Sequence, residues 1–480
     1  MLFEVSHPDA SELINSDDQL STPSVYQPVK KLKTIMKKNL LMGLMLLGWG
    51  TAAQAQTKLS LSVPLLDVPQ NTQLPHRYPS MHQALQWSAD VYDVSFWGID
   101  AASNALFDKK WTQTSFSYAT GLLFSKYGSE LPLPLGVWGH EEYHRSVLGA
   151  NGVASKNGNW IFHRWDGTVY GPSDEDLANL KATDNNALLY AYTAGVQYET
   201  QLTKTSVMND FYNERSFYKA PLYLYNAHYV WNYFRFATST HSDSVKVIAP
   251  KFEHKEATQR DFAGADLTAW AYDMFNPNAS YYDRDDFPNG EGENRRIGFH
   301  DLSEEAQKYL VKQKRLSLLN FLNPAIILVN RIRINEELTI LPFVQYSPTL
   351  FGNSISLNMP FNYKGDGYFL GVNRYANYKH AYYGVEAGVY QRPIDALQGL
   401  SMSCTVKLWK QPSSFFGSKA SWGGAIKWGV AYAVADRLAL TLDVTGKTAG
   451  WLEGNPYLKR NFNPVLGFQY IVPGLNSGRL

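Results

Sequence analysis

Two different periods of apolar residues divide the chain into a helical part and a strand-rich part. Between about residue 56 and residue 330, apolar positions recur every three or four residues, which is typical of amphipathic helices. From about residue 337 onwards they alternate with polar positions, which is typical of β-strands with one apolar face. The pattern therefore predicts an α+β protein whose helices precede its sheet.

Eight strands separated by turn signals are predicted in the C-terminal part. They lie at residues 337–346, 353–361, 367–374, 381–390, 400–409, 423–433, 437–446 and 465–472. On the seventh, Leu438 and Leu440 point to one face, whereas Ala439 and Thr441 point to the other. Lengths of about 8–11 residues suit strands that cross a membrane. We therefore predict an antiparallel β-barrel of the outer-membrane type over residues 331–480, with a soluble sandwich or periplasmic barrel as the alternative.

Residues 56–330 are predicted to form a mainly helical region. The predicted helices lie at 116–127, 136–148 and 185–203, at 217–236 and 260–275, and after the capping residues Ser173 and Ser303. Residues 57–85 contain several prolines and are predicted to be extended. Asn157-Gly158 and Asp166-Gly167 are hairpin signals that predict a small β-meander at 152–171. That meander and residues 90–100 are candidates for further barrel strands.

The first 55 residues read as an upstream extension followed by a signal peptide. Residues 1–35 carry no apolar period, and the segment from Met36 to Lys38 supplies a basic start. The apolar run from Leu40 to Trp49 precedes Ala53-Gln54-Ala55, a small-x-small cleavage site. We predict cleavage near Ala55 and export to the cell envelope, most specifically to the outer membrane. The run is shorter than the ~20 residues of a membrane-spanning helix.

Composition narrows the classes of partner. A net charge of +1 gives no basic field for nucleic acid, so no nucleic-acid partner is expected. The single cysteine, Cys404, excludes a disulfide within the chain. Aromatic residues make up 14% of the chain, which suits the belts of a protein embedded in outer-membrane lipid and also a surface that binds polysaccharide or peptide.

One short motif carries candidate chemistry, at His140-Glu141-Glu142-Tyr143-His144. On a helix, residues four apart lie one above the other, so His140 and His144 can point at one metal ion. Glu141 lies on the same turn, within reach of a water bound to that metal. Two imidazoles with a third ligand and one open position are typical of a catalytic zinc site, so Zn²⁺ is the expected cofactor.

Several residues are candidates for the third ligand. Glu199 lies on the apolar stripe of the helix at 185–203, where a lone carboxylate is costly unless it is paired or bound to a metal. The alternatives are His228 on the helix at 217–236, and Asp266 and Asp273 on the helix at 260–275. A buried salt bridge is the structural explanation for such groups. His163, in the predicted meander, is a further imidazole, but a histidine in a strand is more often surface or packing.

The motif resembles the HExxH signature of the zincin metallopeptidases, and with a downstream glutamate it is most similar to the gluzincins. The resemblance covers one helix and Glu199. It implies that His140 and His144 are zinc ligands and that Glu141 is the general base. The Gly-x-x-His extension of metzincins does not follow His144. The strand-rich part resembles outer-membrane β-barrel proteins, although the segment Gly474–Leu480 lacks their terminal aromatic residue.

These observations support two hypotheses about function. The first is an envelope zinc hydrolase, specifically a peptidase acting on a peptide or protein substrate, in which Glu141 takes a proton from metal-activated water. The second is a non-enzymatic outer-membrane barrel whose helical region plugs the lumen and holds a structural or vestigial metal site.

Overall fold

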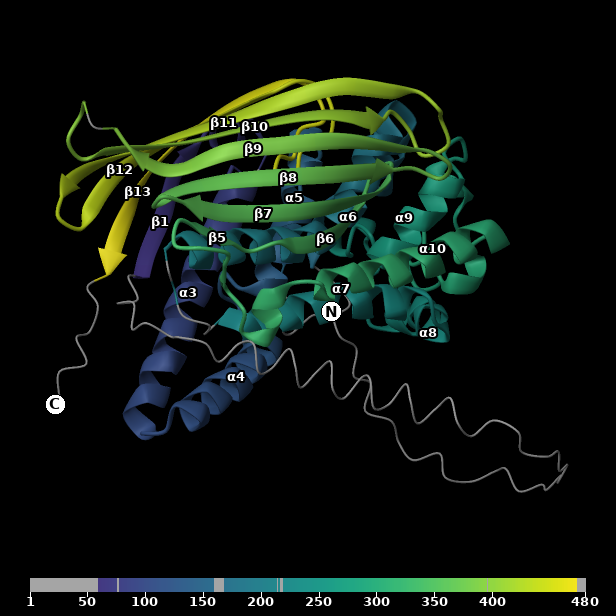
Figure 1. Ribbon diagram of the computed structural model, residues 1–480. Coiled ribbons are helices and arrows are strands. Elements are labelled where there is room, and N and C mark those ends of the chain that lie inside the picture. The colour runs from purple at the N-terminus through teal and green to yellow at the C-terminus, as the bar shows by residue number, and fades with distance from the viewer. Residues whose placement is uncertain are drawn as a thin grey trace, which may run out of the picture. The chain divides into compact units, whose positions relative to one another are not determined.

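A curved antiparallel sheet and a group of helices make up the protein, and the helices lie on one face of the sheet (Figure 1). The computed structural model describes residues 59–75, 77–158, 168–213, 215, 219–394 and 396–472. They belong to one compact unit that begins at Gln56. The predicted signal peptide, the cleavage site near Ala55 and His163 lie outside the described residues.

The described part of the sheet has eleven strands, which follow one another along the sheet in nearly the reverse of chain order. The order is β1-β13-β12-β11-β10-β9-β8-β7-β5-β4, and β6 pairs with another part of β7. The strands are β1 (Leu59–Asp67), β4 (Ile332–Arg333), β5 (Leu338–Ile340), β6 (Phe343–Thr349), β7 (Gly352–Tyr363), β8 (Asp366–Ala376), β9 (Ala381–Pro393), β10 (Leu400–Pro412), β11 (Ala420–Ala435), β12 (Leu438–Lys447) and β13 (Asn461–Val472).

All eight strands predicted from alternation are confirmed, the first of them as the pair β5 and β6. The α+β class is confirmed as well. β1 comes from the proline-bearing segment predicted only as extended, and it pairs with β13 from the other end of the described chain. The sheet therefore takes its first strand from the part of the sequence that precedes the helices.

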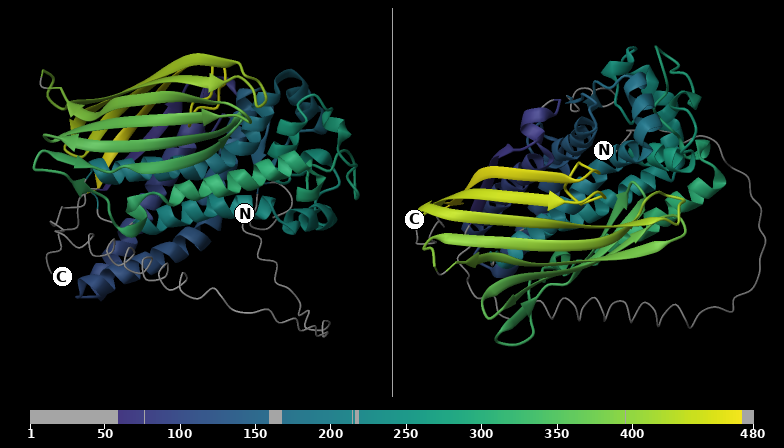
Figure 2. Two further views of the ribbon diagram at one scale, coloured as in Figure 1. Left: turned by 45° about the vertical axis from the view of Figure 1, so that its right-hand side comes forward. Right: turned by 90° about the horizontal axis from the view of Figure 1, so that it is seen from above.

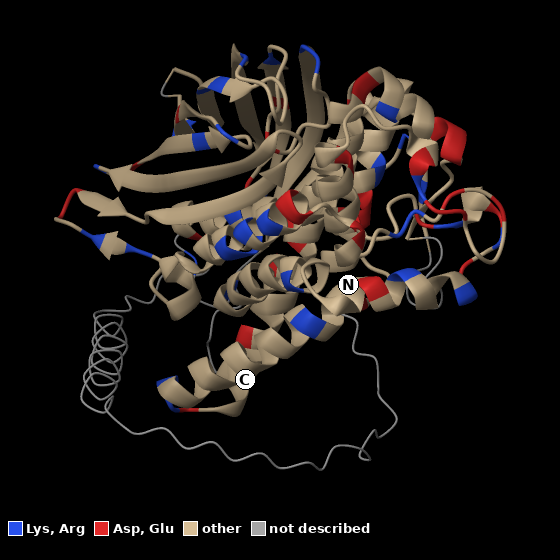
Figure 3. Ribbon diagram, turned by 90° about the vertical axis from the view of Figure 1, so that its right-hand side faces the viewer, with Lys and Arg blue, Asp and Glu red and all other residues tan. Residues whose placement is uncertain are grey.

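The prediction of a barrel is wrong, because the sheet does not close on itself. Its end strands, β1 and β4, do not pair with each other. Helical segments occupy the places where closing strands would lie. The curvature of the open sheet around the helices is clear in Figures 2 and 3.

The helices of the described residues come from the segment between β1 and β4. They are α2 (Gln70–Gln73), α3 (Met81–Leu106), α4 (Lys110–Tyr127), α5 (Gly136–Ala150), α6 (Asp174–Tyr212), α7 (Ala220–Ala237), α8 (Thr240–Ile248), α9 (Asp266–Phe275) and α10 (Glu304–Ser317). No helix among these residues is long and apolar enough to cross a membrane. The candidate barrel segment 90–100 is helical, so its prediction as a strand is wrong.

Local signals explain where several of these helices begin and bend. The predicted caps at Ser173 and Ser303 are confirmed, since each side chain accepts a hydrogen bond from a backbone N–H three residues later. The two helices predicted after Ser173 form one element, α6, which bends at Asp184, where φ is −153° and ψ is 80°. In the predicted meander, Lys156–Asn157 (β2) pairs with Val169–Tyr170 (β3), and residues 159–167 lie outside the described residues.

A buried cluster of charges joins three helices at one end of the molecule. Lys219, just before α7, lies 2.5 Å from an oxygen of Asp93 on α3 and 2.9 Å from an oxygen of Asp210 on α6. Arg215 forms an ion pair with the same Asp93. All four side chains are buried, so the two cations balance the two carboxylates inside the protein.

Lys219→Met should destabilise the protein by about 3–5 kcal/mol, because it leaves two buried carboxylates to share one cation. Chemical denaturation measures the effect. Lys246→Met is the matched control, since Lys246 pairs with Asp285 and Asp301 at the surface. The control should lose no more than about 1 kcal/mol. Equal losses in both variants would contradict the structural role given to the buried cluster.

Candidate metal centre

Helix α5 carries the HExxH motif through the centre of the helical layer. Every residue from Gly139 to Gly149 is buried. His140 and His144 lie one turn apart on the same face, with ring centroids 4.9 Å apart. The predicted helix and the shared face of the two imidazoles are thus confirmed.

Two glycines allow α6 to cross very close to α5. A Cβ atom on Gly139 of α5 would lie 2.2 Å from the ring of Tyr198 on α6. A Cβ atom on Gly195 of α6 would lie 2.2 Å from Nε2 of His144 and 2.3 Å from Nε2 of His140. Any side chain at Gly195 would therefore occupy the space into which both imidazoles point.

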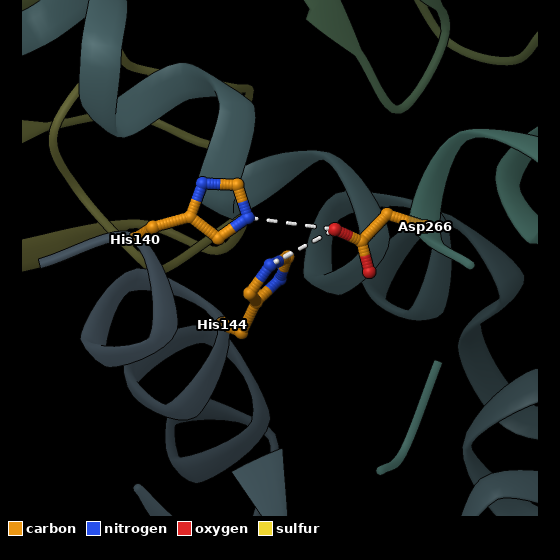
Figure 4. Close-up of side chains that lie close together, drawn as sticks. All are labelled: His140, His144 and Asp266. Carbon is orange, nitrogen blue, oxygen red and sulfur yellow. Dashed lines mark ion pairs between the residues drawn. The ribbon is translucent and has the colours of Figure 1, made fainter. Parts of the chain in front are cut away.

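Helix α9 brings a carboxylate to the same point from another side. Oδ2 of Asp266, the first residue of α9, lies 3.5 Å from Nε2 of His140 and 3.3 Å from Nε2 of His144 (Figure 4). The hydroxyl of Tyr233 on α7 donates a hydrogen bond of 2.6 Å to the same oxygen. His140, His144 and Asp266 form a buried group whose ligand atoms could hold a metal ion.

The other nitrogen of each imidazole is held by α6. Nδ1 of His144 lies 2.5 Å from the backbone carbonyl of Ala191, and Nδ1 of His140 lies 3.0 Å from Oε1 of Glu199. A carbonyl can only accept, so Nδ1 of His144 carries the hydrogen and donates it. Ala191, Gly195 and Glu199 are four residues apart and share one face of α6. This face fixes both rings with Nε2 turned towards Asp266.

Three atoms that can each donate a lone pair to a metal therefore converge at the site. Carboxylate and imidazole acceptors that face one another require a cation between them, either protons or a metal. In a tetrahedral zinc site, bonds of about 2.0–2.1 Å place two ligand atoms roughly 3.3–3.4 Å apart. The distances of 3.3 and 3.5 Å from Asp266 to the two histidines match that spacing.

The electrostatic field at the site favours positive charge. Burial alone would lower the pKa of His140, but Glu199 and Asp266 outweigh it and raise that pKa to about 10. Burial likewise opposes the charged form of His144, and Asp266 raises its pKa nevertheless. Burial would raise the pKa of Asp266, whereas the two histidines lower it well below its usual range. The group therefore stabilises a cation in a place from which water is largely excluded.

Glu141 is a buried carboxylate beside this group. No hydrogen bond or ion pair holds it among the residues that the structure describes. Burial raises its pKa to about 7; His140 and His144 act to lower the pKa, and Asp261 and Asp266 add to the rise. A carboxylate with these properties can exchange a proton near neutral pH.

The structure separates the candidates for the third ligand. Glu199 contacts the Nδ1 side of His140, whereas Asp266 lies on the Nε2 side of both histidines. His228 is exposed on α7, where its ring lies against Trp231. Asp273 is neutralised in a buried network with Lys181 and Arg284.

The roles of Tyr233, Gly195 and the Ala191 carbonyl were not predicted from the sequence, because no motif marks these residues. A glycine four residues before a buried glutamate, Glu199, was the signal that could have indicated a close crossing.

No family model matches the chain, and neither the curated proteins nor the solved structures compared with it are significantly similar to it. The site therefore has to be interpreted from its own geometry.

Gly195→Ala should weaken metal binding at least roughly tenfold, because the new methyl group displaces an imidazole, and should destabilise the protein by about 1–3 kcal/mol. Gly98→Ala on α3 is the matched control, since a Cβ there meets nothing within 4 Å. The control should be as stable as the parent or more stable by up to about 1 kcal/mol. Titration with a chromophoric zinc chelator measures the affinity, and unchanged affinity in Gly195→Ala would contradict the described geometry.

Proposed function

We propose that this protein is a zinc-dependent hydrolase that cleaves peptide bonds. The observation that carries the proposal is that Oδ2 of Asp266 lies within 3.5 Å of Nε2 of His140 and of Nε2 of His144, with Glu141 next to His140 on the same helix. Two neutral imidazoles and one carboxylate are a donor set that suits Zn²⁺ and leaves a fourth position for water.

Each residue of the site has a distinct role in this proposal. Asp266 is the third ligand, and Glu199 orients His140 through its Nδ1–H, as carboxylates commonly do behind zinc-bound histidines. Bound zinc would polarise the substrate carbonyl and acidify the water. Glu141 would accept a proton from the attacking water and pass it to the leaving amine. The hydroxyl of Tyr233 donates a hydrogen bond to Oδ2 of Asp266 and keeps this carboxylate in position.

A structural metal site is the second candidate function, and the burial of the group favours it. His140, His144, Asp266 and Glu141 are each between 1% and 8% exposed. A closed site with no room for substrate would stabilise the fold without performing chemistry. Export to the envelope and an outer-membrane location remain predictions from the sequence.

The purified protein should contain about one zinc ion per chain. His144→Ala and Asp266→Ala should lose it, since each removes a ligand. Glu199→Gln should retain zinc with roughly 10–100-fold lower affinity, because it only loosens the orientation of His140. Metal analysis after dialysis against a chelator measures these differences. The control is His228→Ala, on the exposed side of α7, which should bind zinc as the parent does. If Glu199→Gln lost zinc as completely as Asp266→Ala, the roles given to the two carboxylates would be contradicted.

Glu141→Gln should keep the zinc ion and lose hydrolysis of fluorescently labelled casein by at least about 100-fold, because glutamine cannot accept the proton. Glu142→Gln is not a suitable control, since Glu142 pairs with Arg145. Glu305→Gln, at the exposed start of α10, serves instead and should leave turnover unchanged. If the parent protein shows no hydrolytic activity and unfolds when zinc is removed, the result would favour a structural metal site over an enzyme.

A further inference from the structure

The face of the sheet that points away from the helices is apolar and exposed. On β10, Val406 and Leu408 point outwards and are 41% and 55% exposed, whereas Lys407 and Trp409 between and beside them are buried. The neighbouring strands show the same alternation. The exposed apolar residues on this side of β7 to β13, which we call the outer face, are Leu357, Tyr363, Leu370, Val372, Tyr383, Val385, Val406, Leu408, Trp422, Ile426, Trp428, Tyr432, Val434, Leu438, Leu440, Phe462, Leu466 and Tyr470.

Cross-strand pairing makes most of these residues one continuous surface. Leu357 pairs with Val372, Val372 with Val385, and Val385 with Leu408. Further along the sheet, Tyr432 pairs with Leu440, and the same register continues into β13 and β1. Paired residues project from the same side of a sheet, so the surface crosses eight strands without interruption.

The opposite face of the sheet is more polar than this one. On β7 the inward residues Ser354, Ser356 and Asn358 are buried, while Leu357 between them is exposed. On the neighbouring strands, two inward charges pair with each other, Lys407 with Glu386 at 3.3 Å. A sheet in water places its apolar side chains inwards. Apolar-out and polar-in alternation is typical of strands whose outer face contacts lipid.

Charge and length define a band across the outer face. Its outward charged residues are Arg374 and Lys410 at one end, and Asp366 with its ion-pair partner Arg392 at the other. On β10 the uncharged outward positions run from Leu400 to Leu408, or roughly 30 Å at 3.3 Å per residue. Tilted strands of about 9–11 residues cross a bilayer core. At the charged end Lys410 lies 5.7 Å from the ring of Trp422, as residues of a membrane–water interface do.

A sheet in lipid must also have no bare edge, because unpaired backbone groups are costly there. Along β1, Asp90 of α3 accepts from the N–H of Ser62, and Gln83 of α3 donates to the carbonyl of Leu65. Along β6, the carbonyl of Leu322 accepts from the N–H of Val344. Helical segments therefore satisfy polar groups on both edges of the open sheet.

The segments that cover these edges are themselves apolar on their exposed side. The hydroxyl of Tyr118 on α4 donates to the carbonyl of Ile326, so α4 contacts the segment that leads into β4. Large exposed apolar residues occur on α3, on α4 and in residues 318–334. They are Val94, Leu106, Trp111, Leu122, Leu123, Tyr127, Leu318, Leu322, Ile327 and Ile334.

We propose that the outer face is covered by the acyl chains of a lipid bilayer, and that the apolar side chains exposed on α3, on α4 and in residues 318–334 lie beside those chains at the edges of the sheet. The sheet stays open in this arrangement, with its apolar face towards lipid and its polar face towards the helices. A second copy of the chain is a poorer occupant, because the outer face follows the outward curve of the sheet and would meet a like face along a narrow strip. The proposal is independent of the metal centre and its chemistry.

The test introduces one lysine on each side of β11 in the full-length protein. Ile426, 54% exposed, points outwards, whereas Ala433 is exposed and points to the interior. In vesicles of dimyristoylphosphatidylcholine, Ile426→Lys should lower the folded-to-unfolded ratio at least roughly 30-fold, since a lysine on the lipid face of a strand is costly. Ala433→Lys should change it less than about threefold. In water, lysine in place of an exposed isoleucine should leave the folded-to-unfolded ratio unchanged. A fall of that ratio in vesicles therefore distinguishes a face covered by lipid from one covered by solvent.

Flotation provides the second measurement. The parent protein should float with the vesicles after an alkaline carbonate wash, and brominated lipid should quench tryptophan fluorescence less in Trp422→Phe/Trp428→Phe than in the parent. An unchanged folded-to-unfolded ratio of Ile426→Lys in vesicles would overturn the proposal. A protein that stays in detergent-free buffer as a monomer, or as a dimer that Ile426→Lys dissociates, would also overturn it, and the dimer would identify the second copy as the occupant.

Discussion

The close crossing of helices α5 and α6 is the constraint on which the rest of the helical layer depends. Gly139 and Gly195 let the two backbones approach within a distance that no side chain at either position would permit. At that distance one face of α6 presents the carbonyl of Ala191 and the carboxylate of Glu199 to the two imidazoles. Both rings are then fixed by hydrogen bonds on one side and open to Asp266 on the other. The electrostatics of the centre follow from this arrangement, because the hydrogen-bond acceptors behind the rings and the carboxylate in front of them create a position that favours a cation.

Much of this centre could be predicted from the sequence, and the part that could not has a physical reason. The spacing of His140 and His144 specifies a shared helical face, and burial follows from the apolar residues around them. The choice between Glu199 and Asp266 depends on which nitrogen of His140 each carboxylate meets. That is decided by the crossing of α6 and by the position of the first turn of α9, and both are tertiary features. A lone carboxylate on an apolar stripe was correctly identified as partnered, but the sequence does not distinguish a ligand from a group that orients one.

The fold was predictable where one period dominates. Alternation in the C-terminal part located all eight strands, because successive residues of a strand point to opposite faces. A sheet with one apolar and one polar face therefore has an apolar residue at every second position. The pattern does not reveal whether the end strands meet. The apolar pattern did not predict α3 either, because the buried residues Asp90 and Asp93 interrupt its helical period. Asp90 accepts a hydrogen bond from the edge of β1, and Asp93 pairs with Arg215 and Lys219. Polar residues that pair with other elements inside the protein, rather than face water, thus made both this helix and the ends of the sheet unpredictable from the apolar pattern.

The pairing of β1 with β13 has a consequence for how the protein can be assembled. The carboxylate of Asp67 meets the side-chain amide of Asn463, 396 positions later, at 3.4 Å. Ordering a loop of that size has to precede the contacts that reward it, which makes this step slow compared with the hairpins between neighbouring strands. During synthesis β1 must therefore wait for β13, and a molecule cut before Asn461 would leave β1 without its partner strand. Until β13 is available, a growing chain exposes an unpaired strand edge and apolar strand surface, and both favour aggregation.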